Sequence, residues 1–154
     1  MTRPFAEAYL PTLLAGRRAV VVGAARGIGK ATADAFEAAG AQVVRLDIAA
    51  SGPVHACDVT DEASVTKAFE AAATAGPIDD VVHAAGIATI GAVADMSAAE
   101  FRRVVDVNLT GAFLVAHEAA RHLPSGGNLV FVASQAGLKG GRLWGAYSAS
   151  KGGL

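Results

Sequence analysis

The stretch RAVVVGAARGIGK, residues 18–30, decides the fold. After Arg18 it continues as an apolar run with three consecutive valines, which predicts a strand buried on both faces over 18–25. Three glycines follow in G-x-x-x-G-x-G spacing, and an alanine-rich segment then predicts a helix over 27–40. A strand, a glycine turn and a helix in this order predict a pyrophosphate site, because glycines allow close backbone approach and the helix N-terminus offers free N–H groups.

The same alternation continues along the rest of the chain. Strands are predicted over 41–47, 54–59, 78–86 and 127–134, and helices over 61–76, over 97–123 and from about Leu143. This pattern favours an α/β fold with a doubly wound, Rossmann-like parallel sheet in the order 3-2-1-4-5. We expect a lead-in over 1–13 and one dinucleotide-binding domain over 14–154.

Composition excludes several classes of protein. Apolar residues make up 53% of the 154, yet no run approaches the roughly 18 uninterrupted apolar residues of a membrane span. The net charge is −1 and there is no basic run, so no nucleic-acid partner is expected. The only cysteine, Cys57, fits a reducing compartment, and we expect a cytoplasmic protein.

An acidic residue follows the glycine turn at the spacing expected for a ribose-binding carboxylate. Asp47 ends the second predicted strand, 18 residues after Gly29. A carboxylate there repels a 2′-phosphate, so NAD is favoured over NADP, although Arg26 in the turn favours the opposite choice. The simpler alternative is that Asp47 is a solvated acid at a strand end.

Several motifs together resemble those of the short-chain dehydrogenase/reductase family. They are the glycine turn, VNLTG at 107–111 and YSASK at 147–151, with Ser134 placed 13 residues before Tyr147. The match runs nearly end to end from about Leu14. The resemblance implies that the catalytic residues are Asn108, Ser134, Tyr147 and Lys151.

The resemblance also implies a set of cofactor-binding positions. They are Gly23, Arg26, Gly27, Ile28, Gly29, Asp47, Asp58, Val59, Ala85, Gly86, Tyr147 and Lys151. One motif departs from the family pattern, because its N-N-A-G turn reads His83-Ala84-Ala85-Gly86 here. The hydrogen bonds that the two asparagines usually make are therefore in question.

The implied reaction is hydride transfer between a nicotinamide cofactor and a secondary alcohol or ketone. Tyr147 would act as general acid/base, because the Lys151 ammonium and the oxidised nicotinamide lower the pKa of a phenol from about 10. In the family the same lysine holds the nicotinamide ribose, and Ser134 orients the substrate oxygen. Asn108 resembles the residue that anchors a water linking the lysine to solvent.

Two other functions stay open. Family members continue beyond the Tyr-Lys helix with a sixth strand, a substrate lid and a seventh strand, so we expect this chain to be a fragment of a longer protein. It is then either catalytically competent or a dinucleotide-binding fragment without turnover. An epimerase or dehydratase using the same cofactor and tyrosine is the third possibility. The full-length protein is expected to form a homo-oligomer and to act on a small molecule.

The segment 135–146 is expected to line the substrate side. Trp144 and Leu138 suggest an apolar wall, and Arg142 is more simply interpreted as a solvated residue than as an anion contact.

No metal site is expected. The segment HEAARH resembles a zinc-binding helix, but His117 and His122 are five residues apart and do not share a helix face. Both histidines are interpreted as solvated or capping residues.

Overall fold

The computed structural model describes residues 12–154, so most of the predicted lead-in over 1–13 lies outside the described residues. Five strands form one parallel sheet in the order β3-β2-β1-β4-β5, which confirms the predicted topology. The strands are β1 (Arg18–Val22), β2 (Gln42–Asp47), β3 (Val54–Ala56), β4 (Asp80–His83) and β5 (Asn128–Phe131).

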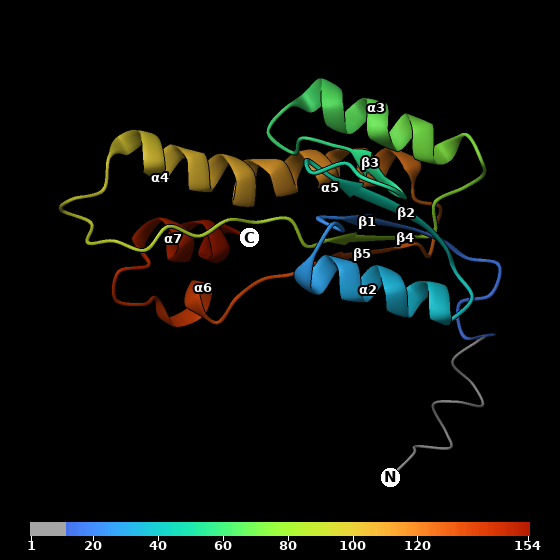
Figure 1. Ribbon diagram of the computed structural model, residues 1–154, viewed down its shortest axis with the longest axis horizontal. Helices are drawn as coiled ribbons and strands as arrows, with labels where there is room; N and C mark the ends of the chain where they lie inside the picture. The colour runs from blue at the N-terminus through green and yellow to red at the C-terminus, as the bar shows by residue number, and fades with distance from the viewer. Residues whose placement is uncertain (1–11) are drawn as a thin grey trace, which may run out of the picture.

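Helices cover both faces of this sheet. They are α2 (Gly27–Ala38), α3 (Glu62–Ala73), α4 (Ala98–Val105), the π-helical turn η2 (Asp106–Thr110), α5 (Gly111–His122), α6 (Ala136–Lys139) and α7 (Gly145–Gly153). Figure 1 shows α2 on one face of the sheet, α3 and α5 on the other, and α6 and α7 beyond the carboxyl ends of the strands. None of the helices between residues 12 and 154 is long and apolar enough to cross a bilayer.

The packing of β1 on both faces explains why its sequence is apolar after Arg18. Val20 and Val22 belong to the larger core cluster beneath α3 and α5, whereas Val21 belongs to the smaller cluster beneath α2. Successive side chains of a strand point to opposite faces, so a strand covered on both sides needs no polar alternation.

The predicted strands extend too far at their carboxyl ends. β1 stops at Val22 because Gly23 has a φ of +85° and turns the chain out of the sheet. β4 stops at His83 rather than residue 86, and β5 at Phe131 rather than residue 134. The residues beyond these ends form the loops of the candidate site.

The helix predicted over 97–123 is interrupted. Its start is right, since Ser97 is the N-cap residue of α4 and forms a capping box with Glu100. After α4 the helix changes to the wider π-helical turn η2 and then continues as α5. π-helical turns of this kind are rare and often mark functional positions, and η2 contains Asn108.

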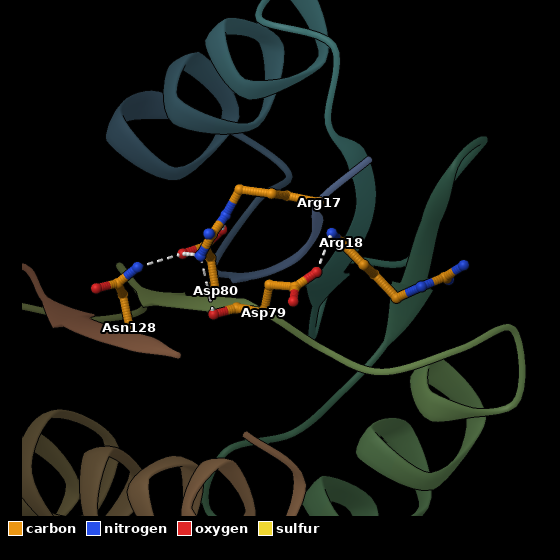
Figure 2. Close-up of polar contacts among 5 residues, drawn as sticks. All are labelled: Arg17, Arg18, Asp79, Asp80 and Asn128. Atoms are coloured by element: carbon orange, nitrogen blue, oxygen red, sulfur yellow. Dashed lines mark hydrogen bonds and ion pairs between the residues drawn. The ribbon is translucent and has the colours of Figure 1, made fainter. Parts of the chain in front are cut away.

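A polar cluster fastens the sheet at the amino ends of its strands (Figure 2). The Arg17 guanidinium donates to both carboxylate oxygens of Asp80 at 2.7 Å, and Asn128 Nδ2 donates to Oδ1 at 2.7 Å. Asp79 accepts the backbone N–H of Arg18 at 2.8 Å. Burial alone would raise the pKa of Asp80, but the hydrogen bonds from Arg17 and Asn128 hold this pKa below its ordinary 3.8. The cluster therefore links β1, β4 and β5 at the end of the sheet remote from the loops of the candidate site.

Candidate active site

A cleft of about 570 Å³ opens where β1, β2 and β4 end. Its lining includes every predicted cofactor-binding residue that precedes the α7 helix, from Gly23 to Gly86. Clefts at the carboxyl ends of parallel strands are the usual ligand sites of open α/β sheets.

Two glycines of the turn lie where no side chain would fit, so backbone segments pack closely together beside the cleft. A Cβ on Gly23 would lie 2.5 Å from the backbone nitrogen of Ala85, and one on Gly29 would overlap the carbonyl oxygen of Gly23. Among the described residues no side chain caps the start of α2, and the first turn of this helix has no acidic residue. The free N–H groups and the positive end of the helix dipole thus suit a pyrophosphate.

Asp47 is fixed at the edge of this cleft. Its Oδ2 accepts the backbone N–H of Ala25 and its Oδ1 accepts that of Ala49, each at 3.0 Å. A carboxylate oxygen accepts two hydrogen bonds, so each oxygen keeps a lone pair for a ribose hydroxyl. Arg26, the rival for a 2′-phosphate, is exposed at the start of α2.

Further lining residues carry functional groups that the sequence analysis did not assign, among them Arg103 and Cys57. Arg103 of α4 lies one turn before Val107, and both line the cleft. An exposed arginine on a helix has no distinguishing sequence signal. Cys57 also lines the cleft, and burial, with the nearby Asp58 and Asp47 carboxylates, raises the pKa of its thiol to about 11, so the thiol is unreactive.

Asn108 joins three segments of the site. Its side chain is buried, and it accepts the N–H of Ile87 and donates to the carbonyl of Ile87, both at 2.8 Å. Its amide nitrogen also donates to Ser150 Oγ at 3.0 Å. Both amide protons are thereby engaged, so a water at this position would have to use Oδ1 or a backbone carbonyl.

Ser150 is a site residue that the sequence analysis missed. The side chain is fully buried, and its hydroxyl donates to the backbone carbonyl of Tyr147 at 2.8 Å while accepting from Asn108. It therefore connects η2 to the turn of α7 that carries Tyr147. Within the YSASK motif, the only sequence signal for Ser150 was its place beside Lys151 and about one turn after Tyr147.

Tyr147 and Lys151 lie one turn apart on α7, as their spacing predicts. The Lys151 ammonium lies 6.0 Å from the centre of the Tyr147 ring and donates to the carbonyl of Val132 at 2.7 Å. Burial lowers the pKa of Lys151 below its ordinary 10.5. The Trp144 ring packs edge-on against Tyr147, with ring centres 5.1 Å apart.

A second pocket, of about 380 Å³, has both Ser134 and Tyr147 among its lining residues. Ser134 Oγ accepts the N–H of Ala136 at 3.2 Å, which leaves the hydroxyl proton for another acceptor. Trp144 lines the pocket as predicted. The prediction for Leu138 is wrong, because this side chain is 87% exposed and lies outside the lining. Leu138 points to solvent from the short helix α6, which the sequence analysis did not predict.

His83 occupies the first position of the altered N-N-A-G turn. It is fully buried, its ring packs edge-on against Phe131 at 5.9 Å, and neither ring nitrogen has a hydrogen-bond partner among residues 12–154. Burial, and to a smaller extent the Lys151 ammonium, lowers the pKa of His83 from 6.5 to about 4. The imidazole therefore replaces a hydrogen-bonding asparagine with a neutral ring that packs in the core.

The burial of His83 predicts how the free energy of unfolding depends on pH. The unfolded chain binds a proton at His83 below pH 6.5 and the folded chain only below about 4, so stability falls as pH decreases between these values. From pH 7 to pH 5 the loss attributable to His83 should be about 2 kcal/mol. Urea unfolding at both pH values should show this loss in the unmodified chain and its absence in His83→Leu.

The exposed His55 provides the matched control for that measurement. The His55→Leu variant should keep the full loss of stability between pH 7 and pH 5. Equal losses in His83→Leu and the unmodified chain would contradict the assignment.

The two histidines of the HEAARH segment lie in different surroundings. His117 is exposed, as expected. Glu118 between them is only 3% exposed, accepts from Thr66 Oγ1 at 2.8 Å, and lies 3.5 Å from His122 Nε2. The segment thus fastens α5 to α3, which a helix-face argument from the sequence did not reveal.

Comparison with known proteins agrees with this geometry. The family model described as short chain dehydrogenase matches residues 17–154. The chain is 36% identical over 159 residues to D-threitol dehydrogenase of Mycolicibacterium smegmatis and 34% identical over 161 residues to the 3-oxoacyl-[acyl-carrier-protein] reductase MabA of Mycobacterium bovis. A crystal structure of a short chain dehydrogenase from Mycobacterium smegmatis superposes with a TM-score of 0.85 at 29% identity, covering 92% of this chain and 66% of that one.

The alignments cover this chain more completely than they cover its relatives. They include 92% of this chain and 61% of the threitol dehydrogenase, and 100% of this chain and 65% of the reductase. The chain thus spans less than two thirds of the length of both relatives.

Proposed function

The chain belongs to the short-chain dehydrogenase family, and from this premise we propose that it is an NAD(P)-dependent oxidoreductase acting on a secondary alcohol or ketone. The observation that carries the proposal is the shared pocket of Ser134 and Tyr147, with Lys151 one turn further along α7. A hydroxyl donor, a phenol and an ammonium in this arrangement suit proton transfer at the substrate oxygen.

The residues of the cleft fit a dinucleotide. We assign the pyrophosphate to the glycine turn and the start of α2, the adenosine ribose to Asp47, and the adenine to Asp58 and Val59. Lys151 is assigned to the nicotinamide ribose. When bound, the nicotinamide supplies the hydride acceptor or donor.

Residues of this chain would transfer the proton to or from the substrate oxygen. The Ser134 hydroxyl donates a hydrogen bond to the substrate oxygen and thereby orients the substrate. Tyr147 takes the proton of the alcohol, or returns it to the ketone oxygen in the reverse direction. The Lys151 ammonium, held by the Val132 carbonyl at 2.7 Å, stabilises the phenolate that forms.

The second candidate is a dinucleotide-binding protein without turnover. It is favoured by the lining of the cleft, which includes neither Ser134 nor Tyr147. The part of the dinucleotide that lies in this cleft would then bind without Ser134 and Tyr147. Epimerase or dehydratase chemistry at the same tyrosine is the third candidate.

One experiment separates the three candidates. NADH is titrated into the chain to measure binding, and then a panel of ketones is added while absorbance at 340 nm and substrate conversion are followed. Ketone-dependent loss of absorbance supports the oxidoreductase. Binding without conversion supports the second candidate. In a parallel assay with NAD⁺ and a panel of secondary alcohols, conversion without net absorbance change supports the third.

We propose NAD rather than NADP as the cofactor. Replacing Asp47 with serine should weaken NAD binding and tighten NADP binding, shifting the preference at least about tenfold, because the repulsion of a 2′-phosphate is removed. Calorimetric titration with both dinucleotides measures the ratio. The exposed Asp95 offers the control Asp95→Ser, which should leave the ratio unchanged. An NADP preference already present in the unmodified protein would show that Arg26 dominates.

We also propose that the protein is cytoplasmic and forms a homo-oligomer. The single cysteine, Cys57, supports a reducing compartment. Phe113 on α5 is 63% exposed, and we propose that self-association through this helix covers it. Sedimentation of the unmodified protein beside Phe113→Ser tests the second point, and identical monomer profiles would contradict it.

A further inference from the structure

The charges of this chain are divided unevenly along its length. All 14 acidic residues precede Ala119, whereas four of the 13 basic residues, Arg121, Lys139, Arg142 and Lys151, follow it. The overall charge of −1 conceals this division. The whole stretch from β5 to the end of α7 is therefore free of carboxylates.

The second pocket is built entirely from this acid-free stretch. Its lining runs from Ser134 to Tyr147 and contains one cationic side chain, Lys139, and no anionic one. Lys139 lies in α6 and makes no ion pair or side-chain hydrogen bond with any residue between 12 and 154. An unneutralised ammonium at the wall of a concave site attracts an anion more than the same group on an open surface does.

The remaining lining gives the pocket its other preferences. Trp144 supplies an aromatic ring, which packs edge-on with Tyr147. Gln135 adds an amide that can donate and accept hydrogen bonds. An apolar wall with a few convergent polar groups is the usual composition of a small-molecule site. An apolar substrate body can pack on Trp144 while its reacting oxygen faces Ser134 and Tyr147.

We propose that this pocket takes a ketone or secondary alcohol that carries a carboxylate, with the carboxylate held by Lys139. The inference rests on the proposed function, because Ser134 and Tyr147 mark the place of the reacting oxygen. Arg142 is exposed and lies outside the lining, so it is not assigned to the substrate.

The test uses two probes that differ in charge and by one methyl group: phenylglyoxylate and its methyl ester. Trp144 is the only tryptophan of the chain, so its indole N–H gives a single resonance that reports on this pocket. Each probe is titrated with and without NAD⁺, which cannot reduce a ketone, so the probes stay intact. Phenylglyoxylate should bind at least about fivefold more tightly than the ester in at least one condition, as expected for one partly exposed charge pair.

Two matched variants distinguish a direct contact with Lys139 from the electrostatic attraction of the whole basic region. Lys139→Gln should make the two probes bind equally, whereas Arg142→Gln, which removes the same charge nearby, should keep the preference. The proposal is overturned if the ester binds as tightly as the anion or if neither probe shifts the resonance. It is equally overturned if Lys139→Gln retains the preference or Arg142→Gln abolishes it.

Failure here and failure of the proposed function give different results. An anion preference without ketone-dependent absorbance change at 340 nm would leave the pocket assignment standing and refute the oxidoreductase. Turnover of neutral ketones without any anion preference would do the reverse.

Discussion

Replacing Tyr147 with phenylalanine should lower turnover by about 10²–10⁴-fold, the range that a positioned general acid/base contributes. The change removes one oxygen and keeps the ring, so the contact with Trp144 at 5.1 Å should survive. Cofactor binding should stay within about twofold, because Tyr147 does not line the cleft. Ketone-dependent oxidation of NADH measures the first effect, and a binding titration measures the second.

The chain contains one other tyrosine, Tyr9, which allows the same chemical change to serve as a control. Tyr9→Phe should leave turnover unchanged. Turnover of Tyr147→Phe within tenfold of the unmodified protein would refute the acid/base assignment.

Replacing Gly137 with alanine should lower the free energy of unfolding by about 1–3 kcal/mol and reduce turnover by about 10²-fold. Gly137 is where α6 packs on α7, and a Cβ there would lie 2.5 Å from the carbonyl carbon and oxygen of Lys151. Backbone atoms cannot swing aside, so α6 and α7 must separate. That movement shifts Ser134 relative to Tyr147 and Lys151. Urea unfolding measures the stability, and the absorbance assay measures the turnover.

Gly91 provides the comparison, because a Cβ there meets nothing within 4 Å, although Gly91 pairs with the backbone beside Trp144. Gly91→Ala should change the stability by less than about 0.5 kcal/mol. Equal stability of Gly137→Ala and Gly91→Ala would show that the contact of α6 with α7 is loose.

The sheet could be predicted from the sequence because its signals are local and strong. The valine run of β1 and the glycines after it identify a buried parallel strand and a turn, and the handedness of crossovers then limits the strand order. The spacing of Tyr147 and Lys151 likewise fixes their common helix face. These features depend on residues that are close together in the chain.

The features that the sequence did not reveal depend on contacts between distant segments. The interruption at η2 follows from Asn108 reaching Ile87 and Ser150, which lie 21 and 42 residues away. The burial of Glu118 depends on Thr66, 52 residues earlier. The lining role of Lys139 depends on the one-turn helix α6, which is too short to have a recognisable period.

The polar cluster of Arg17, Asp80 and Asn128 has a consequence for engineering this protein. The hydrogen bonds of this cluster lie where the strands begin, while the groups assigned to recognition and chemistry lie where the strands end or beyond. Substitutions that tune heat tolerance at the first end should therefore leave selectivity at the second end intact, and the two properties should be open to optimisation in separate rounds.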